Sequence, residues 1–202
     1  MSQGEEPAGQ FERGTGRLEA FSDAVMAVII TIMAFGLHAP QGHHLSDVQA
    51  ELPGLLVYAL SFTFIAIYWN NHHHLLRAAD RINGAVMWAN MFLLFWLSLI
   101  PVLTQWISAE YRYSLPAASF GLNALAAALA YGLLVRALIR ANGRTSRLAA
   151  AIGSDRKGNA SLALYALSVP LAWVSPWISY GIYIAVAVIW FVPDRRFTRG
   201  RG

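Results

Sequence analysis

The chain has 202 residues, of which 56% are hydrophobic and 13% charged, and its mean hydropathy is +0.44. A soluble domain carries roughly 25% charged residues, so this composition excludes an ordinary soluble domain and predicts an integral membrane protein. The absence of cysteine excludes disulfides and thiol chemistry. The net charge of +4 is interpreted as a topology signal, with no nucleic-acid partner expected. No removable signal peptide is expected, because no short apolar core with a cleavage site follows the polar first sixteen residues.

Apolar segments follow one another along the chain. A spanning helix needs about 20 mostly apolar residues, and four blocks come close to or exceed that length. The last apolar region is too long for one span, and Ser175-Pro176 interrupts it, so we predict a hairpin of two short spans there. The six predicted spans are Leu18–Leu37, Leu52–Trp69, Ala85–Trp106, Leu115–Leu138, Ala160–Trp173 and Trp177–Val192.

The sequence thus predicts an all-α polytopic membrane protein with six transmembrane helices. Residues 17–193 would form the membrane domain, 1–16 a disordered cytoplasmic N-terminus and 194–202 a basic cytoplasmic tail. Of the fifteen Lys and Arg residues, only Arg112 lies in the connectors after the first, third and fifth spans. The positive-inside rule then places both termini in the cytoplasm of a multi-pass protein of the cell membrane.

The first span has two chemically different faces. At 100° per residue, one stripe of side chains within about 60° of a line contains Phe21, Ala24, Val28, Thr31, Ile32 and Phe35. This stripe is apolar except for one threonine at mid-depth, and Asp23 lies about 120° away from it. Such a face can line a narrow apolar pathway, since hydrophobic constrictions gate ions by dewetting. The same face can also pack against lipid or a neighbouring helix.

Polar residues gather at one membrane depth. Ser22 and Asp23 open the first span, Trp69 and His72 share a face at the end of the second, and Asn90 lies in the third. An indole N–H, an imidazole and an amide can together satisfy the buried hydroxyl and carboxylate. The aspartate also has a simpler interpretation, because the free amides and the dipole of a helix N-terminus favour a carboxylate there.

Three motifs carry a resemblance to a known family. They are Arg17-xxx-Phe21-Ser22-Asp23 in the first span, Trp69-xx-His72-His73 ending the second, and Asn90 followed by Pro101 in the third. On these motifs, over roughly residues 17–105, the chain resembles the transmembrane protein 175 family of potassium channels.

The resemblance implies a potassium-permeable channel that lacks the usual Thr-Val-Gly-Tyr-Gly filter, with the first helices around the pore and bulky apolar constrictions. One six-helix repeat per chain implies a homotetramer. The partners implied are potassium ions and the lipid bilayer, with no resident cofactor besides the permeant ion. The implied pore-lining or gate residues are Val28, Thr31, Ile32 and Phe35. The implied structural network near the cytoplasmic mouth consists of Arg17, Phe21, Ser22, Asp23, Trp69, His72 and Asn90.

Two other function classes compete with a channel. The six histidines suggest a membrane metal enzyme, but three precede and three follow the second span, about 30 Å apart across the bilayer. We therefore expect no metal site and no enzyme. A proton-coupled transporter that uses the intramembrane Asp/His cluster is the stronger alternative. Steady, potential-driven ion flux distinguishes a channel from stoichiometric proton exchange.

Overall fold

The structure is a computed structural model that describes residues 8–143, 146, 148, 149 and 155–191, with side chains described from Thr15 onward. The described residues contain helices and no strand. The helix bounds are α1 Ala8–Phe35, α2 Leu45–Arg77, α3 Gly84–Ser98, α4 Ile100–Glu110, α5 Ser114–Asn142, α7 Arg156–Leu171 and α8 Pro176–Phe191.

The predicted six-span architecture is confirmed, with α3 and α4 together forming the third span. Four described segments are long and apolar enough to cross a membrane, the third of them being Gly84–Glu110. The remaining two spans are α7 and α8, with 16 residues each. Their hairpin forms where Ser175-Pro176 predicted it, because α8 begins at Pro176, a position that needs no N–H for the helix ladder.

The third span is broken, and this break was not predicted. α3 ends at Ser98, Leu99 separates the two helices, and Pro101 occupies the first turn of α4. Proline lacks the backbone N–H that would bond the carbonyl four residues earlier. The ladder therefore restarts at this point, and α4 continues toward the end of the bundle where α5 begins.

α1 also differs from the prediction at its start. It begins at Ala8, ten residues before the predicted span, so residues 8–16 are helical and not disordered as expected. Gln10, Glu12 and Arg13 are good helix formers, and no proline interrupts the chain between Ala8 and Phe35. Residues 1–7 and the tail predicted for 194–202 lie outside the described residues.

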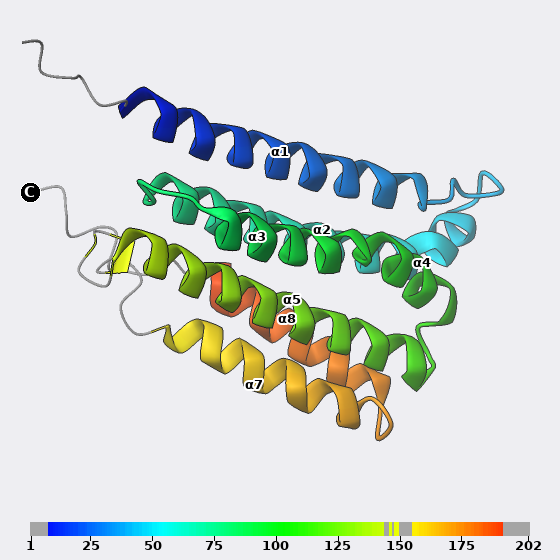
Figure 1. The fold of residues 1–202 in the computed structure, drawn as a ribbon. Helices are drawn as coiled ribbons and strands as arrows, with labels where there is room; N and C mark the ends of the chain where they lie inside the picture. The colour runs from blue at the N-terminus through cyan, green and yellow to red at the C-terminus, as the bar shows by residue number, and fades with distance from the viewer. Residues whose placement is uncertain (1–7, 144–145, 147, 150–154, 192–202) are drawn as a thin grey trace, which may run out of the picture.

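The helices pack in an order that leaves α1 at one side of the bundle. Figure 1 shows α1 lying over α2 and α3, with α5, α7 and α8 on the opposite side. α1 contacts α2, α3 and α4, whereas α5 contacts α3, α4, α7 and α8. The bundle interior includes the fully buried Ile65, Leu93, Leu97 and Leu134. α1 is thus packed along one face only.

Candidate functional site

The packed face of α1 is almost entirely apolar. Leu18, Met26, Ile29 and Met33 recur at helical spacing and are all buried. Burial of a large aliphatic side chain is worth roughly 1.5–3 kcal/mol, although lipid reduces that benefit because the solvent outside is also apolar. Packing and a few hydrogen bonds therefore hold α1 in place.

The opposite face of α1 is free in the subunit. The sequence stripe lies on it: Phe21 is 48% exposed, Val28 55%, Ile32 45% and Phe35 83%. Thr31 lies on the same face and is exposed. Its hydroxyl donates to the carbonyl of Ala27 at 2.9 Å. Because the hydroxyl proton is directed at the backbone, the oxygen lone pairs remain available to a cation on the free face.

A buried chain of hydrogen bonds joins α1, α3 and α2. The Ser22 hydroxyl donates to the carbonyl of Leu18 at 2.8 Å. The Asn90 side chain donates to Ser22 Oγ at 2.9 Å, and His72 Nε2 lies 2.7 Å from Asn90 Oδ1. Ser22, His72 and Asn90 are each 0% exposed. Three spans are therefore tied together by polar atoms that have no access to water.

The chain of bonds fixes the proton positions. Ser22 gives its only proton to a carbonyl, so it accepts from Asn90. The amide nitrogen of Asn90 therefore faces Ser22, and its oxygen faces the imidazole. His72 Nε2 must then carry a proton and donate it. Nδ1 of His72 is buried and has no partner among the described residues, which suits the lone pair of a neutral ring.

A second set of contacts lies beside the first, and only its part between Trp69 and Asp23 was predicted. The Trp69 indole donates to Asp23 Oδ1 at 3.0 Å, and His73 Nδ1 lies 2.7 Å from Glu19 Oε1. The Trp69 and His73 rings stack with centroids 5.7 Å apart. Arg77 Nη1 lies 3.5 Å from His73 Nε2. The close contact of His73 Nδ1 with Glu19 does not have the geometry of a hydrogen bond. Glu19 was missed, although it precedes Asp23 by four residues, the same spacing that separates Trp69 from His73.

The predicted single network is thus two sets of contacts. The Asn90 amide donates to Ser22 and bonds in turn to the His72 imidazole, while the Trp69 indole donates to Asp23 Oδ1. Arg17 and Phe21 take part in neither set among the described residues: both are exposed, and Phe21 lies on the free face of α1.

Another polar contact fastens the far half of α1. The Thr104 hydroxyl of α4 lies 2.8 Å from Ser61 Oγ of α2 and 3.7 Å from the Met33 sulfur of α1. Near the end of α1, a Cβ placed on Gly36 would lie 3.0 Å from the Gln105 side chain. Gly36 thus permits a close approach of α1 to α4. None of these residues was predicted from the sequence to hold α1 in place.

The histidine run does not form a metal site. The described residues contain no group of three His, Cys, Asp or Glu side chains that could hold a metal ion. His72 turns to Asn90 on α3, and its neighbour His73 turns to Glu19 on α1. Adjacent helical residues point in directions about 100° apart, so this divergence is expected.

The fold and these contacts define a polytopic helical membrane protein in which the first helix is anchored along one face and free along the other. Residues 17–101 match the family model described as endosomal/lysosomal potassium channel TMEM175. The chain is 44% identical over 184 residues to a potassium channel of a Chryseobacterium species, covering 91% of this chain and 96% of the relative. The chain belongs to the TMEM175 family of potassium channels.

Another relative and two solved structures are also similar to this chain. A potassium channel of Streptomyces collinus is 31% identical over 180 residues, covering 80% of this chain and 84% of the relative. The structure resembles the crystal structure of a lysosomal potassium-selective channel TMEM175 homolog from Chamaesiphon minutus, with a TM-score of 0.77, 25% identity and coverage of 89% and 97%. The fold is also similar to the potassium channel MtTMEM175, with a TM-score of 0.54, 22% identity and coverage of 92% and 91%. These relatives are channels and not enzymes.

Proposed function

We propose that this chain conducts potassium ions across the cell membrane through a pore formed by α1 of four identical subunits. The observation that carries the proposal is the free face of α1, which is apolar except for Thr31, in a member of a potassium channel family. With one six-helix repeat per chain, several copies are needed to enclose an axis, and closed cyclic symmetry gives each copy an equivalent place.

In this pore the apolar constrictions would lie at Val28 and Phe35, with Ile32 beside them. Thr31 lies one helical turn from each, about 4.5 Å and 6 Å along the axis. Four apolar side chains around a narrow axis exclude water, and a dry gap is a large barrier to an ion that must keep its hydration. A ring of threonine oxygens between the constrictions replaces part of that hydration.

The polar residues of α1 would act as positioning residues outside the conduction path. Ser22 and Asp23 bond to α3 and α2, away from the exposed stripe. Their role in this proposal is to fix the rotation of α1 about its own axis, so that the stripe faces the pore. Arg17 and Phe21 would lie at the cytoplasmic mouth, next to this anchor.

The orientation follows from the distribution of basic residues. α1 begins and α8 ends at the same end of the bundle (Figure 1). Arg77, Arg81, Arg140 and Arg156 lie at that end by their places in the helices and connectors, whereas Arg112 follows α4 at the other. The positive-inside rule therefore favours cytoplasmic termini.

The decisive experiment records currents from purified protein in planar bilayers with potassium and sodium on opposite sides. Phe35→Asn should raise conductance, because it admits water at the constriction, and Thr31→Val should move the reversal potential toward zero. Phe95→Asn is the matched control, since Phe95 is 54% exposed on α3 and is not on α1. If Phe35→Asn and Thr31→Val both behave like this control, α1 does not line the pore.

The same preparation tests the assembly and the alternative function. Cross-linking and native mass measurement should give a tetramer; a monomer or dimer as the only conducting species contradicts the proposed pore. A proton-coupled transporter that uses Asp23 and His72 would instead show proton movement in fixed proportion to the substrate. Potential-driven potassium flux without such coupling supports the channel.

A further inference from the structure

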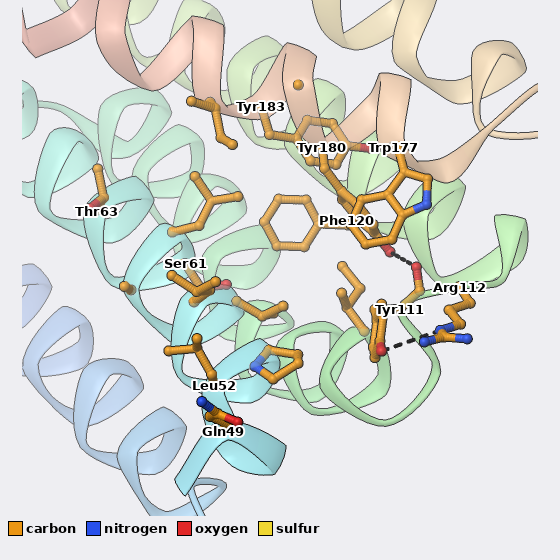
Figure 2. A pocket seen from close by; sticks show the side chains of 18 residues that line it. Gln49, Leu52, Ser61, Thr63, Tyr111, Arg112, Phe120, Trp177, Tyr180 and Tyr183 are labelled. Atoms are coloured by element: carbon orange, nitrogen blue, oxygen red, sulfur yellow. Dashed lines mark hydrogen bonds between the residues drawn. The ribbon is translucent and has the colours of Figure 1, made fainter. Parts of the chain in front are cut away.

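A groove of about 820 Å³ opens between α2 and α8, and it has no role in the proposed pore. Its 18 lining residues come from α2, α4, α5, α8 and the connector after α4, and none belongs to α1. Figure 2 shows Phe120 in the middle of the groove, with Trp177 and Arg112 along one rim. The lining is mostly apolar, and the volume lies within the roughly 300–1,000 Å³ typical of ligand sites.

Arg112 is held at the rim of this groove by its neighbour Tyr111. Its Nε donates to the Tyr111 hydroxyl at 3.2 Å, and its guanidinium lies 5.4 Å from the Tyr111 ring centroid. The Tyr180 hydroxyl of α8 donates to the Tyr111 carbonyl at 2.9 Å, which fastens the connector to the groove wall. Among the described residues no carboxylate lies within ion-pair distance of Arg112. The terminal nitrogens of its guanidinium are thus available to an external anion.

The position of the groove narrows the class of occupant. It lies between spanning helices, in the half of the bundle that contains Arg112, where the surrounding solvent is lipid. Trp177, 60% exposed, lines the rim, and an indole at such a position is typical of the membrane interface. An occupant must therefore combine a long apolar part with an anionic group near the interface. Arginine matches the geometry of phosphate with paired donors.

We propose that this groove binds a glycerophospholipid from the leaflet on the Arg112 side, with an acyl chain between α2 and α8 and the phosphate on the Arg112 guanidinium. Charge complementarity supports this occupant over a helix of a second copy, since an apolar helix face would bury the guanidinium without an anionic partner. An anionic headgroup is bound more tightly than a zwitterionic one, because it brings no cation of its own next to the arginine.

The test measures lipid retention by native mass spectrometry of the detergent-solubilised full chain, with added phosphatidylglycerol or phosphatidylcholine. Arg112→Gln should reduce phosphatidylglycerol retention on the order of ten-fold, the effect of one lost charge-assisted contact. Gly181→Trp should reduce retention of both lipids, since Gly181 lines the groove and a Cβ there meets no atom within 4 Å. Gly132→Trp is the matched control, because Gly132 is equally open but lies on α5 away from the groove.

Equal lipid retention by the parent protein, Arg112→Gln and Gly181→Trp would overturn the proposal. A change of subunit stoichiometry in Gly181→Trp with unchanged lipid retention would assign the groove to a contact between copies and overturn it too. If Arg112→Gln does not fold, Gly181→Trp against Gly132→Trp decides alone. The measurement involves no ion flux, so it stands apart from the proposed conduction.

Discussion

The buried hydrogen-bond chain makes a quantitative prediction for a double-mutant cycle on Asn90 and His72. Asn90→Leu leaves the His72 Nε2 proton buried without an acceptor, whereas Ser22 keeps its own donation to Leu18. An orphaned buried donor costs about 1–3 kcal/mol. Hydrogen bonds between membrane helices average about 0.6 kcal/mol and reach about 1.7. We therefore expect Asn90→Leu to lower the free energy of unfolding by about 2 kcal/mol.

His72→Phe keeps a ring of similar shape but leaves the Asn90 oxygen without its donor, at a cost of about 1 kcal/mol. The double variant has neither orphaned group, so it should be less destabilised than the sum of the single variants by about 1–2 kcal/mol. Equilibrium unfolding in mixed detergent micelles measures all four proteins.

The control cycle pairs Asn90→Leu with Thr104→Val. Thr104 bonds to Ser61 and shares no partner with Asn90, and it lies about 20 Å further along the third span. This pair should be additive within about 0.5 kcal/mol. If Asn90 and His72 are equally additive, the inferred bond and its proton placement are wrong.

Four other substitutions test packing, backbone conformation and the Trp69 hydrogen bond. Gly121→Ala should lower the melting temperature in detergent, because its Cβ would lie 2.5 Å from the Tyr183 hydroxyl, whereas Gly132→Ala, in open space, should raise it slightly. Gly143→Ala should lower the free energy of unfolding by about 1–3 kcal/mol, since Gly143, the residue that ends α5, has a φ of 93° that favours glycine. Unchanged stability would contradict this backbone conformation. Trp69→Phe should lower stability by about 1 kcal/mol through the lost indole bond and leave ion selectivity unchanged; altered selectivity would place the indole in the conduction path.

Much of the architecture could be predicted because hydropathy reports directly on the bilayer. The length of the apolar blocks gave the six spans, and Ser175-Pro176 gave the last hairpin because proline restricts helix continuation in any context. Periodicity alone predicted the apolar stripe of α1 but left open whether a neighbouring helix of the subunit covers it. In the structure it is exposed, and Phe35, at its end, is the most exposed large apolar side chain of the described residues. Periodicity did not tell whether this face meets lipid or a pore, since both select apolar side chains.

The features that escaped prediction depend on relations between helices. Hydropathy marks where a chain leaves lipid and not where its helix ends, so the extension of α1 to Ala8 was missed. Pro101 was noted as part of a motif, but the interruption of the helix at Leu99, which follows from the missing proline N–H, was not predicted. The pair of Glu19 and His73 required the relative rotation of α1 and α2, which spacing along one helix does not define.

In the proposed pore, the division of α1 into two faces separates the residues that stabilise the fold from those that control conduction. Its buried and hydrogen-bonded groups, such as Ser22 and Asp23, point to neighbouring spans, and the exposed stripe contributes no hydrogen bond to another helix among the described residues. Thr31 is the informative position, because its hydroxyl bonds only within its own helix and its loss leaves no orphaned partner elsewhere. In the proposed pore, changes on the stripe should thus alter ion flow while the fold persists, and changes in the anchor should alter the fold first. A chain in which both kinds of change unfold the protein to the same extent would have its first helix buried on all sides, which is incompatible with an axial pore.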